Sequence, residues 1–121
     1  MIEIKDNSKN GNGFDIIHTF DGWKVAFITF APQYGALRVL KRHTQTDEAF
    51  VLVNGKATMF TADCDEPLVE TVMEKEKLYV VKQNTWHHLQ VSADAMLIVV
   101  ENSDTTKANT ESKNLTVEEK E

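Results

Sequence analysis

The chain has 121 residues, a hydrophobic fraction of 41%, a charged fraction of 26% and a formal net charge of −6. This length suffices for one domain with one core, and the composition is that of a globular protein. The acidic balance argues against a nucleic-acid partner, because nonspecific binding to nucleic acid depends on Lys and Arg at the phosphates. A small polar or carboxylate ligand, or another protein, is the expected partner.

The sequence also carries information on the cellular compartment. Cys64 is the only cysteine, so no disulfide can form within the chain, which favours a reducing compartment. No charged-then-apolar leader follows Met1, and no apolar run is long enough to cross a bilayer. The sequence therefore predicts a cytoplasmic protein that does not contact the membrane.

Short strand-like runs recur along the chain, and no segment keeps a helical period. Asp21-Gly22 lies between the first two runs and predicts a two-residue turn with positive φ. Asn54-Gly55 lies between two later runs and predicts a β-hairpin. An all-β domain of eight or so antiparallel strands, as in a jelly-roll barrel, is expected. The predicted runs are 14–20, 23–30, 37–43, 49–53, 56–61, 69–73, 78–81, 87–91 and 96–101.

The two ends of the chain differ from this central part in composition. Residues 1–13 are predicted to form a terminal strand and then a flexible loop rich in Asn and Gly. Residues 14–104 are predicted to form the barrel. Residues 105–121 are polar, and a disordered or weakly helical tail is expected there.

Two short blocks, 43–48 and 86–88, hold three of the four histidines and a well-placed carboxylate. Because side chains alternate along strands, neighbouring strands can aim His43, Glu48 and His87 at one cavity. Two imidazoles and one carboxylate form a facial triad that leaves positions open for water or substrate. The sequence therefore predicts a divalent metal site, for Zn, Ni, Mn or Fe, with these three residues as metal ligands.

Lys41 leaves a second interpretation open. A lysine ammonium is not a metal ligand, and a lysine whose charge is paired keeps its proton. An ion pair between Lys41 and Glu48 would satisfy both charges without a metal. The cavity is then metal-free, and the domain binds a ligand or a partner protein.

The spacing of these residues resembles the first motif of the cupin superfamily. Lys41 stands where cupins usually have a histidine. The residues at the motif positions are Gly35, Lys41, His43, Glu48 and Gly55.

The second cupin motif is matched in spacing and, at one of its four positions, in residue type. Glu76, Lys82, Asn84 and His87 fall where cupins usually have a glycine, a proline, a glycine and a histidine. The resemblance implies a double-stranded β-helix with a metal site in its cavity. It also implies a homodimer, for which the strand face with Trp23, Val25, Phe27 and Thr29 is the expected contact.

The segments 42–55 and 84–88 are also similar to the ureidoglycolate lyase branch of the cupins, which cleaves ureidoglycolate to glyoxylate and urea. This similarity implies an enzyme that acts on a small carboxylate, with Lys41, His43 and His87 as catalytic residues. Lys41 or a metal would polarise the carboxylate or carbonyl group, while a histidine moved the proton.

Overall fold

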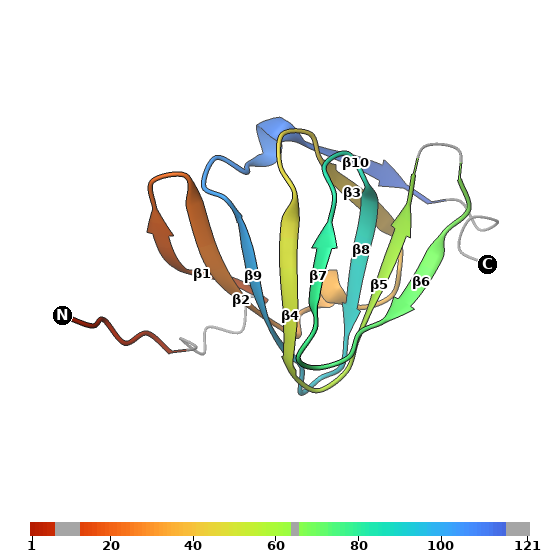
Figure 1. The fold of residues 1–121 in the computed structure, drawn as a ribbon. Coiled ribbons are helices and arrows are strands. Elements are labelled where there is room, and N and C mark those ends of the chain that lie inside the picture. The colour runs from red at the N-terminus through yellow and green to blue at the C-terminus, as the bar shows by residue number, and fades with distance from the viewer. Residues whose placement is uncertain (7–12, 64–65, 116–121) are drawn as a thin grey trace.

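The protein, represented by a computed structural model that describes residues 1–6, 13–63 and 66–115, consists of two five-stranded antiparallel sheets (Figure 1). The predicted all-β class is confirmed. The first sheet has the order β1 (Phe14–Phe20), β2 (Trp23–Thr29), β9 (Met96–Asn102), β4 (Glu48–Asn54) and β7 (Leu78–Val81). The second has the order β10 (Thr110–Asn114), β3 (Val39–His43), β8 (Trp86–Val91), β5 (Ala57–Ala62) and β6 (Val69–Val72). Two short 3-10 helices, η1 (Pro32–Tyr34) and η2 (Lys107–Asn109), lie in the connections.

The core lies between the two sheets because each strand alternates apolar side chains inward. In β2, Ala26 and Ile28 are buried, whereas Trp23 on the opposite face is exposed. The fully buried Leu97 and Val99 of β9 occupy the centre of the first sheet. The core cluster consists of Ala26, Ile28, Phe50, Leu52, Ala57, Met59, Met73, Val81, Leu89, Val91, Ala95, Leu97 and Val99.

One of the two predicted turns forms a hairpin and the other does not. Asp21 adopts a φ of 50°, and the turn joins β1 to its partner β2, as predicted. The predicted hairpin at Asn54-Gly55 is wrong, because β4 belongs to the first sheet and β5 to the second. Gly55 has a φ of 75°, and a Cβ there would lie 2.7 Å from the Cα of Ala95. The turn therefore makes a tight corner between the sheets, where only glycine fits without strain.

At two positions where the second cupin-like motif has glycine, this chain has a different residue in a backbone conformation that favours glycine. Glu76 has a φ of 68° and Asn84 a φ of 66°. Residues other than glycine seldom adopt this left-handed conformation, although Asn tolerates it better than most. The motif is therefore preserved in backbone shape where it is lost in residue type.

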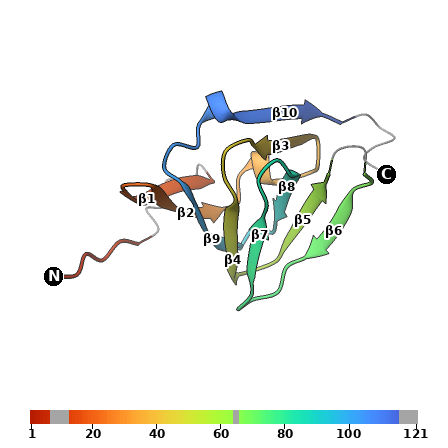
Figure 2. The same ribbon diagram turned by 45° about the horizontal axis from the view of Figure 1, so that its top comes forward.

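The two ends of the described chain correct the sequence prediction. Residues 1–6 contain no strand, and the predicted loop lies largely outside the described residues. Residues 110–114, predicted as part of a disordered or helical tail, form β10 and pair with β3 along its whole length. Figure 2 shows β10 alongside β3 at one end of the barrel. As an edge strand with exposed side chains, β10 needs backbone hydrogen bonds rather than an apolar pattern, so composition did not reveal it.

The outer face of the first sheet is apolar over four strands. Among the described residues, no element covers it, and no helix is long and apolar enough to cross a membrane. Cys64 lies outside the described residues. Two successive rows across β2, β9, β4 and β7 contain Val25, Val100, Ala49 and Val80, and Phe27, Ile98, Val51 and Leu78.

Candidate metal centre

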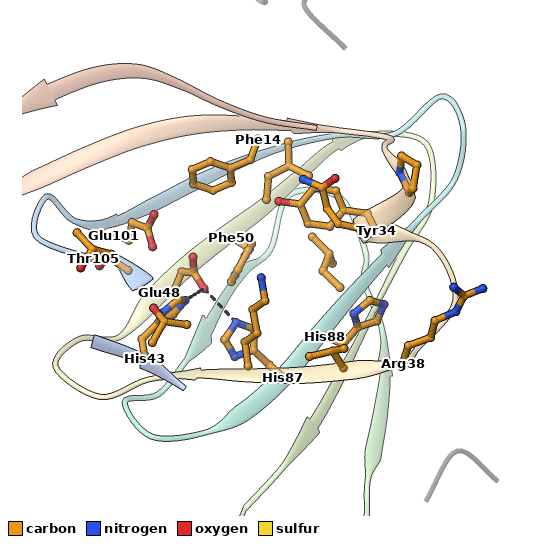
Figure 3. A pocket seen from close by; sticks show the side chains of 18 of the residues that line it. Phe14, Tyr34, Arg38, His43, Glu48, Phe50, His87, His88, Glu101 and Thr105 are labelled. Carbon is orange, nitrogen blue, oxygen red and sulfur yellow. Dashed lines mark hydrogen bonds and ion pairs between the residues drawn. The ribbon is translucent and has the colours of Figure 1, made fainter. Parts of the chain in front are cut away.

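Three of the predicted site residues converge at one end of the barrel (Figure 3). His43 ends β3, Glu48 begins β4 and His87 lies near the start of β8. Oε1 of Glu48 lies 3.2 Å from Nε2 of His43 and 3.3 Å from Nε2 of His87. The three ligand atoms all lie within 4.8 Å of one another. The sequence prediction that these side chains share one site is therefore confirmed in the geometry.

Two loops at this end hold the site in place. The Asp47 carboxylate accepts a hydrogen bond from the Gln83 backbone N–H at 2.8 Å. The Gln83 side chain donates to the carbonyl of Thr44 at 2.6 Å, and the Asn84 N–H donates to the carbonyl of His43 at 2.9 Å. These bonds join the loop before β4 to the loop before β8. They fix the starts of both strands, and with them the carboxylate and the second imidazole.

The outer nitrogens of both imidazoles are hydrogen-bonded. Nδ1 of His87 donates to the carbonyl of Thr85 at 3.1 Å, and Nδ1 of His43 is bonded to the hydroxyl of Thr110 at 2.9 Å. A neutral His87 with its proton on Nδ1 presents the Nε2 lone pair to Glu48. A lone pair facing a carboxylate oxygen is repulsive unless a proton or a cation lies between them. This arrangement is typical of histidines that ligate metals.

Glu48 is a buried carboxylate, 5% exposed. Burial by itself would raise its pKa, but the imidazoles of His43 and His87, in their protonated form, more than offset that effect and lower the pKa to about 2. Although Oε1 is close to both imidazoles, it has no hydrogen-bond partner of proper geometry among the described residues. A buried, ionised oxygen without a hydrogen bond is costly, so this atom requires another partner.

Glu101 is a site residue that the sequence analysis missed. It ends the inward face of β9, is 6% exposed, and lies beside Glu48 on the neighbouring strand (Figure 3). Its carboxylate is 3.8 Å from Nζ of Lys24. Burial and the negative charge of Glu48 raise the pKa of Glu101 to about 8. An acidic residue that directly follows the apolar run 96–100 was the signal available in the sequence.

Lys41 does not pair with Glu48. It faces His87 across β3 and β8 and lines the same cavity. Among the described residues, the ion pairs of Glu48 are with the two histidines, and Lys41 is in none. The predicted metal-free alternative, in which Lys41 neutralises Glu48, is therefore not the arrangement that the chain adopts.

A cavity of about 600 Å³ opens next to these residues. Phe14 and Phe50 line the cavity with aromatic rings. His88 also lines the cavity, near the loop after η1, and Nε2 of His88 donates a hydrogen bond to the carbonyl of Gly35 at 2.9 Å. Burial lowers the pKa of His88, which favours the neutral ring. The polar and charged lining residues are Gln33, Tyr34, Arg38, Lys41, His43, Glu48, His87, His88, Glu101, Thr105, Thr106 and Thr110.

Comparisons with known proteins find relatives by structure only. No family model matches the chain, and no curated protein matches it. A variant of PAC13 from Streptomyces, in a structure with uridine, has a TM-score of 0.64 at 13% identity, and the match covers 95% of this chain and 87% of that chain. PAC13 is described as a nucleoside dehydratase.

Two further structures are cupins by description. A cupin-2 domain protein from Shewanella frigidimarina has a TM-score of 0.56 at 17% identity, and the match covers 74% of this chain and 78% of that chain. An RmlC-like cupin from Methanocaldococcus jannaschii, with a double-stranded β-helix fold, has a TM-score of 0.59 at 13% identity, and the match covers 84% and 92% of the two chains. At these identities, the likeness concerns the fold.

Proposed function

Because this chain has the cupin double-stranded β-helix, as its sequence motifs predicted, we propose that it binds a divalent metal through His43, Glu48 and His87. The observation that carries the proposal is the buried oxygen Oε1 of Glu48. It faces two imidazole nitrogens but has no hydrogen bond among the described residues. A metal ion between the three atoms would satisfy all of them.

The distances between the ligand atoms support this proposal. Ligand atoms about 2.1 Å from a metal lie about 3.0 Å apart in neighbouring octahedral positions and about 3.4 Å apart in a tetrahedron. The two separations from Glu48, 3.2 and 3.3 Å, fall between these values. Each histidine is therefore at a separation from Glu48 that suits two neighbouring ligands of one metal ion. Two nitrogens and one oxygen suit Zn, Ni, Mn or Fe.

The cavity beside the proposed metal is suited to a small polar or carboxylate ligand. Lys41 and Arg38 line it as cations, and neither forms an ion pair among the described residues. When bound, the metal would polarise an oxygen of the ligand. Lys41 would attract an anionic group, and His43 or His87 would move a proton if that histidine were not bound to the metal. Lys41, His43 and His87 are thus the residues that we propose for catalysis.

The experiment that tests the metal site uses untagged protein purified without added metal. We expect inductively coupled plasma mass spectrometry to find close to one equivalent of metal in this protein. If the purified protein is metal-free, it should bind one equivalent of Zn²⁺ or Mn²⁺ in isothermal titration calorimetry. His43→Ala, Glu48→Gln and His87→Ala should each abolish binding. His18→Ala is the matched control, because His18 lies on β1 and does not line the cavity. Wild-type protein that neither contains nor takes up metal would contradict the proposal and favour a metal-free, ligand-binding cupin domain.

Ureidoglycolate cleavage stays a prediction from the sequence similarity. Its support in the structure is that Lys41, His43 and His87 line one cavity. Release of urea from ureidoglycolate should be lost in Lys41→Ala and His43→Ala. If wild-type, metal-loaded protein releases no urea, the ureidoglycolate assignment is wrong, whereas the metal site is unaffected.

A further inference from the structure

Tyr34 belongs to η1, in the connection from the first sheet to the second. Its ring packs against the core cluster and also lines the cavity. Figure 3 shows it on the wall opposite His43 and His87. The backbone around it is fixed, because the N–H of Tyr34 donates to the carbonyl of Ala31 at 2.8 Å and the His88 ring donates to the carbonyl of Gly35.

The hydroxyl of Tyr34 differs from that of the other tyrosine in its hydrogen bonding. Among the described residues, no hydrogen bond involves it. The other tyrosine, Tyr79, behaves as a partly buried tyrosine usually does: its hydroxyl accepts a hydrogen bond from the backbone N–H of Glu74 at 2.8 Å. The Tyr34 hydroxyl is thus a polar group at the cavity without a hydrogen-bond partner in the part of the chain that the structure describes.

This hydroxyl stays a neutral donor over the whole physiological range. Burial raises the pKa of Tyr34 strongly, and the negative charges of Glu48 and Glu101 raise it further. A neutral phenol can donate one hydrogen bond to an anionic or carbonyl oxygen. The hydrogen bond is stronger when the acceptor is charged.

We propose that Tyr34 is a ligand-binding residue whose hydroxyl donates to an oxygen of a small dicarboxylate-like ligand. Another oxygen of that ligand faces the His43, Glu48 and His87 group on the opposite wall. Lys41 lines the same cavity, opposite His87 in the strand register, and supplies the positive charge that such a ligand needs. This inference rests on the proposed metal function, because the metal provides the second anchor.

The experiment compares wild-type protein with Tyr34→Phe and Tyr79→Phe. Tyr34→Phe removes only the hydroxyl oxygen, so packing against the core is kept. Tyr79→Phe is the matched control, since Tyr79 does not line this cavity. Each protein is first titrated with Zn²⁺, and the metal-loaded protein is then titrated with oxalate, malonate and succinate in calorimetry.

We expect all three proteins to bind Zn²⁺ with the same affinity, and wild type and Tyr79→Phe to bind at least one of the dicarboxylates. Tyr34→Phe should bind that dicarboxylate about 10-fold or more weakly, as for the loss of a hydrogen bond to a charged group. If wild type binds no Zn²⁺, the proposed function fails, and this inference with it. If Zn²⁺ binds but no dicarboxylate does, or Tyr34→Phe binds as tightly as wild type, only this inference is overturned.

Discussion

Lys41 and His87 face each other across β3 and β8, and both side chains project into the cavity. Nε2 of His87 lies 3.3 Å from Oε1 of Glu48, whereas Lys41 forms no ion pair with Glu48. Lys41, which stands where the similar cupin motif has a histidine, therefore adds a positive charge to the cavity without pairing with Glu48. We therefore propose that Glu48 and His87 bind the metal whereas Lys41 attracts an anionic ligand.

Replacement of Lys41 by Met should affect the ligand more than the metal. Removal of a nearby positive charge should leave Zn²⁺ affinity unchanged or make it tighter, because the lysine repels the metal. Succinate binding to the metal-loaded protein should weaken about tenfold or more. Calorimetry measures both, and Lys75→Met, at an exposed position, is the control. Loss of Zn²⁺ binding in Lys41→Met would contradict this division of roles.

Thr110 is expected to orient His43 for metal binding. Thr110→Val removes the 2.9 Å hydrogen bond to Nδ1 of His43 and should weaken metal affinity about 10- to 100-fold, whereas Thr110→Ser should retain most of it. Ser112→Val, on the same strand but without a histidine contact, should bind metal normally. The absorption spectrum of bound Co²⁺ reports the ligand geometry. Equal affinity and spectra in Thr110→Val and wild type would show that β10 has no role in the site.

Ionisation of Glu101 should make the free energy of unfolding of the metal-free protein depend on pH. Because its pKa is about 8 in the folded state and 4.5 is the ordinary value, the folded protein holds a proton that the unfolded chain has lost between these values. The free energy of unfolding therefore falls as pH rises through this window. Glu101→Gln cannot ionise and should remove this decline in urea unfolding of EDTA-treated protein.

The control for this pH dependence is Glu74→Gln. Glu74 is exposed, and its hydrogen bond with Lys77 lowers its pKa, so it titrates below the window. The decline should persist in Glu74→Gln. A wild-type stability that stays level from about pH 5 to about pH 8.5 would rule out the assigned role of Glu101.

The tight corner between the sheets can be tested by substituting Gly55, with Gly22 as the control position. Gly55→Ala places a Cβ 2.7 Å from the Ala95 Cα in a left-handed backbone, so we expect a loss of about 1–2 kcal/mol or more in the free energy of unfolding. Gly22→Ala meets no atom within 4 Å and should change stability by less than about 0.5 kcal/mol. Urea unfolding of both variants measures the difference. Equal losses at the two positions would mean that the corner is not tight.

The homodimer predicted from the sequence should form through the apolar outer face of the first sheet. Val100, at the centre of this face, is 40% exposed, and a contiguous apolar patch of this kind favours burial in an interface. Val100→Lys should convert a dimer to a folded monomer in size-exclusion chromatography with light scattering. Gln90→Lys, at an exposed position of the second sheet, should stay dimeric. A monomeric wild type would contradict the dimer, and a dimeric Val100→Lys would exclude this face.

The sequence predicted the strands well because their signals are local. Alternation of apolar and polar residues located the strands from β1 to β9, and the Asp21-Gly22 turn was recognised from its residue types alone. The spacing of His43, Glu48 and His87 also sufficed to place them in one site. Alternation along a strand and the spacing within a motif depend on neighbouring residues, which a sequence displays directly.

Pairing between distant segments was decided only by the tertiary structure. The Asn54-Gly55 step has the local chemistry of a hairpin, but β4 and β5 find different partners, so the same turn becomes a corner between sheets. The polar strand β10 is held by the edge of β3, which no local pattern encodes. Glu101 reaches the site from β9, which lies outside both motifs, and Tyr34 reaches it from η1, next to Gly35 of the first motif. Lys41 does not pair with Glu48, whose ion pairs among the described residues are with the two imidazoles. These outcomes depend on which distant segments pair in the folded barrel, and the local sequence around each segment does not encode that pairing.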